Sequence, residues 1–160
     1  MNNALHKKVI VVFFLGLALM AGIELGLVWA LEGSFHTDFW RIALGFPLVG
    51  GGLGLVIWSV RTLYVAGLGT PAPAVATQKL VKTGPHRYSR NPMTLGASLF
   101  YLGLAIWAGS GVIFGLVLLI FMALLSYIYV HESRELEARF GVEYRNYCSA
   151  TPFLIPRFPP

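Results

Sequence analysis

KTGPHRYSRNPMTLG, residues 82–96, is a short cationic stretch in a very apolar chain. Four basic side chains fall within nine residues: Lys82, His86, Arg87 and Arg90. Apolar sequence resumes directly afterwards, with Asn91 suited to cap a helix and Pro92 suited to its first turn. The stretch therefore predicts a structured polar segment at the start of an apolar helix.

The composition places the chain among membrane proteins. Of its 160 residues, 56% are hydrophobic and 12% are charged, about half the charged share of a soluble domain. The net charge is +5, but the basic residues flank apolar segments, which indicates membrane topology rather than a nucleic-acid partner. A single cysteine, Cys148, favours neither a disulfide framework nor a metal cluster, and we expect no metal.

Four apolar segments predict four transmembrane helices, roughly over residues 9–31, 40–65, 92–108 and from 112 past Tyr129. The third is short for a span. The turn AGSG joins the last two into a helical hairpin. The fourth should leave the membrane as the charged helix HESRELEARFG, capped by Gly141. We therefore expect an all-α polytopic membrane protein with one membrane domain over residues 1–160.

The charges orient these spans. The N-terminus and the long connection around residues 66–91 are basic, whereas the first connecting loop carries Glu32 and Asp38 against Arg41. The positive-inside rule then places both termini and the long connection in the cytoplasm. We expect an integral protein of a bacterial inner membrane.

Glycine spacing and one acidic residue add expectations about the spans. Three pairs have the small-xxx-small spacing that permits close helix approach: Gly22 and Gly26, Gly50 and Gly54, Gly111 and Gly115. Glu24 is an acid inside the first span. Both a functional role and a polar contact with another helix stay open for it.

A second polar stretch, HESRELEARFGVEYRNY at 131–147, follows the last apolar run. Glu132 is the first acid after that run, and its carboxylate could accept hydrogen bonds from a diol or pair with a cation. The alternative is a helix-end charge facing headgroups. For the first stretch, the alternative to a ligand site is a loop that touches lipid phosphates.

Together, LVKTGPHRYSRNPMTLG and ESRELEARFGVEYRNY, followed by TPFLIPR, resemble the integral-membrane methyltransferases related to isoprenylcysteine carboxyl methyltransferase and bacterial phospholipid methyltransferases. The resemblance covers roughly Thr77 to Arg157. It implies a cytoplasmic pocket for S-adenosylmethionine, with S-adenosylhomocysteine as product, formed by the loop 66–91 and the C-terminal segment 131–160.

The resemblance also implies which residues hold the cofactor, and we add Arg90 for its place beside the helix start. These positions are Gln78, Lys79, Leu80, Val81, His86, Arg90, Asn91, Pro92, Met93, Thr94 and Glu132. Asn91, Thr94 and Ser133 stand where relatives carry His, Tyr and a second Glu. Asn and Thr keep the capacity to hydrogen-bond.

The methyl acceptor and the base are less determined. Ile128 stands where the prenylcysteine enzymes have an Arg for the substrate carboxylate, so we expect a membrane lipid or another apolar acceptor. His86 and His131 are candidate bases, because imidazole titrates near neutral pH; an interfacial role is the alternative for His131. The sequence predicts no oligomeric state.

Three other functions stay open. The first is an isoprenylcysteine-type carboxyl or small-thiol S-methyltransferase. The second is a small membrane protein without enzymatic activity, against which the two paired polar stretches count. The third is a nicotinamide-dependent membrane reductase, which would favour a dedicated basic cluster for a phosphate.

Overall fold

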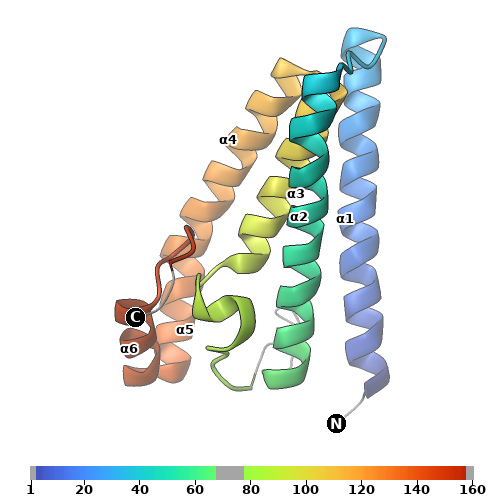
Figure 1. Ribbon diagram of the computed structural model, residues 1–160. Helices are drawn as coiled ribbons and strands as arrows, with labels where there is room; N and C mark the ends of the chain where they lie inside the picture. The colour runs from blue at the N-terminus through green and yellow to red at the C-terminus, as the bar shows by residue number, and fades with distance from the viewer. Residues whose placement is uncertain (1–2, 68–77, 158–160) are drawn as a thin grey trace.

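Four long helices run side by side in alternating directions (Figure 1). The computed structural model describes residues 3–67 and 78–157, and this part of the chain contains no strand. The long helices are α1 (Asn3–Glu32), α2 (Phe39–Ala66), α3 (Pro92–Ala108) and α4 (Gly111–Tyr127). The prediction of an all-α fold is confirmed.

Four short elements follow or connect them. The 3₁₀ turn η2 (Gly84–Arg87) precedes α3. Helix α4 continues through a π-helical turn, η3 (Ile128–Glu132), into α5 (Ser133–Phe140), and α6 (Val142–Ala150) completes the chain's helices in the described part. Gly141 ends α5 with φ 54°, and its N–H donates to the Glu137 carbonyl at 2.8 Å. The predicted charged extension and its glycine cap are confirmed.

In the described part of the chain, three helices are long and apolar enough to cross a membrane: Ala4–Glu32, Phe39–Ala66 and Gly111–Phe140. Helix α3 has 17 residues, a length of about 26 Å at 1.5 Å per residue, whereas a span needs about 20 residues. It is an apolar helix packed against α1, α2 and α4. The fourth span stays a prediction.

Helices α2 and α3 approach each other through glycines. A Cβ built on Gly52 would lie 2.5 Å from the Gly96 carbonyl oxygen, and one built on Gly103 would lie 2.8 Å from the Val49 nitrogen. Gly45 meets the Gly103 carbonyl in the same way, at 2.7 Å. Since any side chain at these positions would overlap backbone atoms, glycine sets the distance between the two helices.

These are not the glycines that the spacing predicts. At Gly22, Gly26, Gly50, Gly54, Gly111 and Gly115 a Cβ would meet nothing within 4 Å among the described residues. The prediction of packing at these pairs is wrong. A four-residue spacing puts two small residues on one helix face, but it does not say that a neighbour covers that face.

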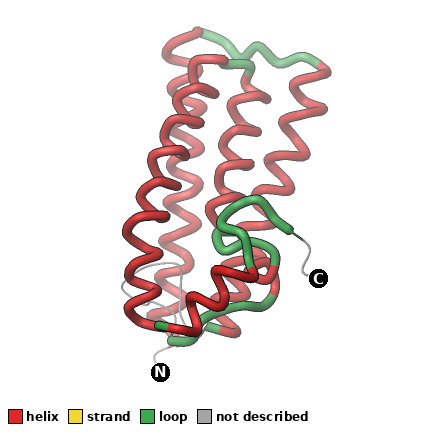
Figure 2. The backbone as a smooth tube through the Cα atoms, turned by 90° about the vertical axis from the view of Figure 1, so that its left-hand side faces the viewer, coloured by secondary structure: helices red, strands yellow, loops and turns green. Residues whose placement is uncertain are grey.

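The two ends of the bundle differ. The start of α1, the end of α2, η2, α5 and α6 gather at one end, and the α1–α2 and α3–α4 connections lie at the other (Figures 1 and 2). At the second end, the His36 N–H donates to the Ala108 carbonyl at 3.0 Å and Ser110 donates to Glu32 at 2.5 Å. The predicted polar stretches therefore share one end of the molecule.

Glu24 lies in neither polar end. It belongs to α1 and is buried, and neither carboxylate oxygen has a hydrogen-bond partner in the described part of the chain. It does not line the cavity described below. Both of its predicted roles stay open.

Candidate active site

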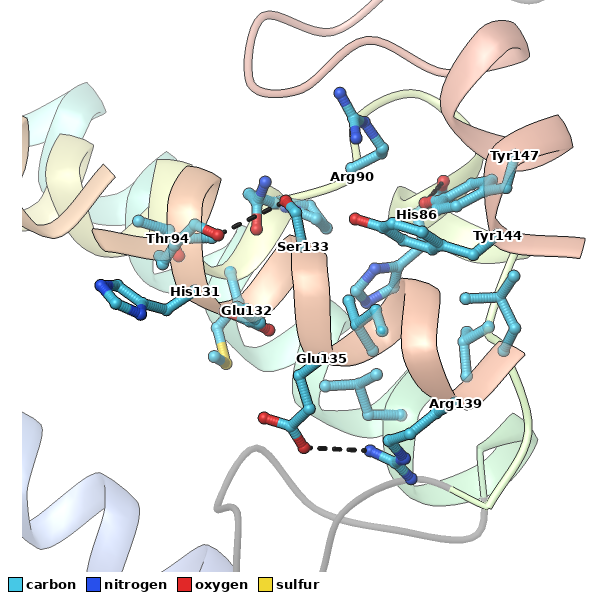
Figure 3. A pocket seen from close by; sticks show the side chains of 18 of the residues that line it. His86, Arg90, Thr94, His131, Glu132, Ser133, Glu135, Arg139, Tyr144 and Tyr147 are labelled. Atoms are coloured by element: carbon cyan, nitrogen blue, oxygen red, sulfur yellow. Dashed lines mark hydrogen bonds and ion pairs between the residues drawn. The ribbon is translucent and has the colours of Figure 1, made fainter. Parts of the chain in front are cut away.

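A cavity of about 440 Å³ lies at the end of the bundle that carries α5 and α6 (Figure 3). Residues of 80–94 form one side, residues of 124–147 form the other, and Leu63 of α2 completes the wall. The volume falls within the range of small-molecule sites. The two polar stretches, far apart in sequence, thus form one pocket.

Most of the predicted site residues line this cavity. They are Leu80, Val81, His86, Arg90, Asn91, Pro92, Met93, Thr94, Ile128, His131 and Glu132. Gln78 and Lys79 are exposed and lie outside the lining, and the Gln78 N–H donates to the Gly67 carbonyl at 2.9 Å. The predicted segment therefore reaches the cavity only from Leu80 onward.

The π-helical turn η3 forms the wall opposite η2. The Ser133 N–H bonds the Ile128 carbonyl five residues earlier, and the Ser133 hydroxyl donates to the same oxygen at 3.4 Å. Ile128, His131 and Glu132 of this turn all line the cavity together with Ser133. Turns of this type recur at functional sites, and here the turn widens the helix so that neighbouring positions face one space.

His86 is the buried polar group of the η2 wall. Its side chain is 8% exposed, and its Nε2 has no hydrogen-bond partner among the residues described. Burial lowers the pKa of His86 to about 4, although a hydrogen bond with the Arg90 backbone acts in the opposite direction. The imidazole is therefore neutral at pH 7. A buried polar atom without a partner is unusual in proteins and fits a polar ligand in the cavity.

The C-terminal segment, residues 152–157, is hydrogen-bonded to residues 88–91 in the loop before α3. The Arg90 N–H donates to the Pro152 carbonyl at 2.9 Å, and the Arg157 N–H donates to the Tyr88 carbonyl at 3.0 Å. The Asn91 side chain donates to the Phe153 carbonyl at 2.9 Å. Asn91 does precede α3 as predicted, but its side chain makes no capping bond to the helix.

The Arg90 guanidinium faces the same C-terminal segment. It donates to the Cys148 sulfur at 2.9 Å, and its central carbon lies 5.4 Å from the centre of the Phe153 ring. Arg90 also borders the cavity. Its predicted contact with a cofactor carboxylate would compete with these bonds, so that contact stays a prediction.

Helix α6 closes the cavity with two buried tyrosines. The Tyr147 hydroxyl donates to the His86 carbonyl at 2.6 Å. Burial raises the pKa of both Tyr144 and Tyr147, so both phenols are protonated at neutral pH. Neither tyrosine was predicted as a site residue from the sequence, yet both border the cavity.

Further lining residues were missed because they look like an ordinary polar helix face. Glu135 and Arg139, four residues apart, form an ion pair at 3.7 Å, and both also border the cavity, as do Tyr127 and Leu136. Positions three to four residues apart share a helix face. The spacing from Glu132 to Glu135, Leu136 and Arg139 was the available signal.

The sequence was compared with known families. Residues 40–143, about two-thirds of the chain, match the phospholipid methyltransferase (PEMT) family. The chain belongs to this family. No match was found among curated proteins. The predicted resemblance to membrane methyltransferases is confirmed, and the apolar helices agree with an integral membrane protein.

The region that matches the family covers most of the elements around the cavity. It begins at the start of α2 and ends at Glu143, near the start of α6. Helix α1 precedes it, and within the described chain no α1 residue lines the cavity. The methyltransferase assignment therefore concerns the part of the chain that builds the pocket.

Proposed function

We propose that this protein transfers a methyl group from S-adenosylmethionine to a lipid or another apolar acceptor at the membrane boundary. The observation that carries the proposal is the single cavity that both polar stretches build at the ends of apolar helices. Its lining combines neutral His86 and the carboxylate of Glu132 with apolar side chains. A site for a polar donor and an apolar acceptor needs both kinds of surface.

The loop 66–91 and the segment 131–160 would hold the donor. Glu132 would accept hydrogen bonds from its hydroxyl groups, and the unpartnered His86 Nε2 offers a further polar contact. When bound, S-adenosylmethionine supplies a methyl group on a positively charged sulfur. The protein's part is to align the acceptor with that methyl at near-attack distance and to exclude water.

The base is proposed among the two cavity histidines. The Nε2 of His86 is buried without a partner among the described residues, so it could take a proton from an acceptor that reaches it, although burial, which lowers the pKa of His86 to about 4, makes it a weaker base than an ordinary imidazole. His131 also borders the cavity and stacks with Tyr127 at a ring distance of 4.9 Å. An amine needs such a proton acceptor more than a thiol does, since a thiol loses its proton more easily.

The lining suggests an acceptor from the membrane. Leu63 and Leu124 belong to helices that are long and apolar enough to span a bilayer, and both border the cavity. Ile128 brings no charge to meet a carboxylate. A lipid amine is therefore our first candidate, and an isoprenylcysteine carboxylate or a small thiol is the second.

Ligand binding to the purified protein in detergent separates the functions. We expect saturable binding of S-adenosylhomocysteine and no binding of NADPH. Binding of NADPH instead would indicate a reductase, and binding of neither would indicate a protein without this chemistry. Transfer of labelled methyl groups to a total lipid extract, compared with small thiols, then identifies the acceptor class.

We further propose four spans with both termini and the cavity in the cytoplasm. The basic residues at the cavity end and the alternating helix directions support this orientation. In a Cys148→Ser background, a cysteine introduced by Phe35→Cys should react with a membrane-impermeant reagent added from the outside only. Reaction from the cytoplasmic side alone would contradict the orientation.

A further inference from the structure

A second cavity of about 330 Å³ lies beside the loop that precedes α3. Leu55 and Trp58 of α2 and Leu95 of α3 form its apolar wall, and Pro156 and Arg157 of the C-terminal segment border it. We propose that this cavity binds one membrane phospholipid, with an acyl chain against the apolar wall and the phosphate beside Arg157.

The apolar wall belongs to the membrane-facing part of the bundle. Trp58 is 49% exposed although it lies near the end of α2, one of the helices that can span a bilayer. Tryptophan is favoured where hydrocarbon meets headgroups. An acyl chain in the cavity would cover Leu55, Leu95 and the indole ring, and it would come from the surrounding bilayer.

The residues that border the second cavity carry positive charge and no negative charge. Arg157 is exposed and forms no ion pair within the described residues, and the cavity lining contains no carboxylate. Two other cations at this end form ion pairs, Lys82 with Glu143 at 2.7 Å and Arg145 with Glu137 at 3.1 Å. A guanidinium binds phosphate oxygens through two parallel N–H bonds, so Arg157 matches a phospholipid phosphate.

The second cavity adjoins the first at Pro92, which borders both. Tyr88 and Arg157 border the second cavity, where the Arg157 N–H donates to the Tyr88 carbonyl at 3.0 Å. A lipid bound beside Arg157 would therefore hold the C-terminal segment against the loop. None of Glu132, His86 and Ile128 lines the second cavity, so the proposal does not depend on the methyl donor.

Native mass spectrometry of the full chain in detergent tests this site, with phosphatidylglycerol as the probe. We expect one retained lipid per chain. Arg157→Ala should lower the bound fraction several-fold, and Leu55→Trp, which fills the cavity, should remove most of it. Lys8→Ala is the matched control, because Lys8 is an exposed cation of α1 at the same end of the bundle.

Two further arms keep the test decisive if Leu55→Trp fails to fold. A photoreactive phosphatidylglycerol should label residues 55–58 or 156–157 of the wild-type protein, none of which borders the first cavity. Free glycerol phosphate should not compete. Equal losses in Arg157→Ala and Lys8→Ala, label confined to 124–147, or full competition by glycerol phosphate would each overturn the proposal.

Discussion

The Tyr147 hydroxyl donates a hydrogen bond of 2.6 Å to the backbone carbonyl of His86, 61 residues earlier in the chain. Both residues are buried, and the bond fastens α6 to η2 across the cavity. Tyr147→Phe leaves the His86 carbonyl buried without this donor, at a cost of about 1–3 kcal/mol. We expect a lower melting temperature in detergent.

The control for this prediction is Tyr129→Phe. Tyr129 is 63% exposed and packs edge-on against Phe153, with its ring 5.3 Å away. Loss of its hydroxyl should leave the melting temperature nearly unchanged. Equal melting temperatures for Tyr147→Phe and the wild type would show that the hydrogen bond does not hold the two halves of the cavity together.

Glu132 is the proposed donor-binding carboxylate. Glu132→Ala should weaken S-adenosylmethionine binding by about 1–3 kcal/mol, since hydrogen bonds to a charged group are lost. Calorimetric titration of the folded variant measures this effect. Glu137→Ala is the control, because Glu137 pairs with Arg145 outside the cavity lining. Unchanged affinity in Glu132→Ala would contradict the assignment.

His86 predicts a pH dependence of stability. Its pKa in the folded protein is lowered to about 4, while in the unfolded chain it is near 6.5. Below pH 6.5 the unfolded state therefore binds the proton more readily, and stability falls as the pH decreases toward 4. Between pH 6.5 and 4.5 the loss due to this residue is about 2 kcal/mol.

Melting curves in detergent across this pH range measure the loss. Carboxylates also titrate there, so the informative quantity is the difference between the wild type and His86→Gln, which lacks the ionisable group. We expect the wild type to lose more stability on acidification than the variant. Parallel curves would mean that His86 accepts a proton without cost in the folded protein.

The sequence predicted the helices well because long apolar runs and their caps are local signals. Gly141, for example, ends α5 as its position predicts. The group of residues around the cavity was also predictable. In a bundle whose helices run in alternating directions, two polar stretches at the ends of apolar helices can meet at the same end of the bundle. The family resemblance implied Gln78 and Lys79 together with Leu80 and Val81, but Gln78 and Lys79 lie outside the lining.

Other features depend on tertiary contacts that no local pattern carries. The π-helical turn at Ile128–Glu132 has no sequence signature in this chain. The contact between residues 152–157 and residues 88–91 consists mainly of backbone hydrogen bonds. The contact between α2 and α3 uses Gly45 and Gly52 of α2 and Gly96 and Gly103 of α3. Within each helix the two glycines are seven residues apart, about two turns, rather than four.

The close approach of α2 and α3 is testable at Gly52. A Cβ there would lie 2.5 Å from both the Gly96 oxygen and the Phe100 nitrogen, so Gly52→Ala must push the two backbones apart. Overpacking of this kind costs about 1–3 kcal/mol, and we expect a clear drop in the melting temperature in detergent.

Gly54→Ala provides the matched control on the same helix. A Cβ at Gly54 meets nothing within 4 Å in the described chain, and alanine favours a helix over glycine. This variant should be as stable as the wild type or slightly more stable. If both substitutions had the same effect, the contact between Gly52 and Gly96 would not set the helix distance.

We expect substrate choice to depend on Ile128, which is buried in the π-helical turn and borders the cavity. A carboxylate beside it would have no charged partner at this position, and burying an unpaired carboxylate is costly. We therefore expect little or no methylation of a farnesylcysteine analogue and better activity on a lipid amine, measured by transfer of labelled methyl groups.

Ile128→Arg would gain activity on the carboxylate only if the cavity accommodates the longer side chain and a second donor. Efficient methylation of farnesylcysteine by the wild type would instead show that another cation of the lining, Arg90 or Arg139, pairs with the carboxylate, and the methyltransferase assignment would stand.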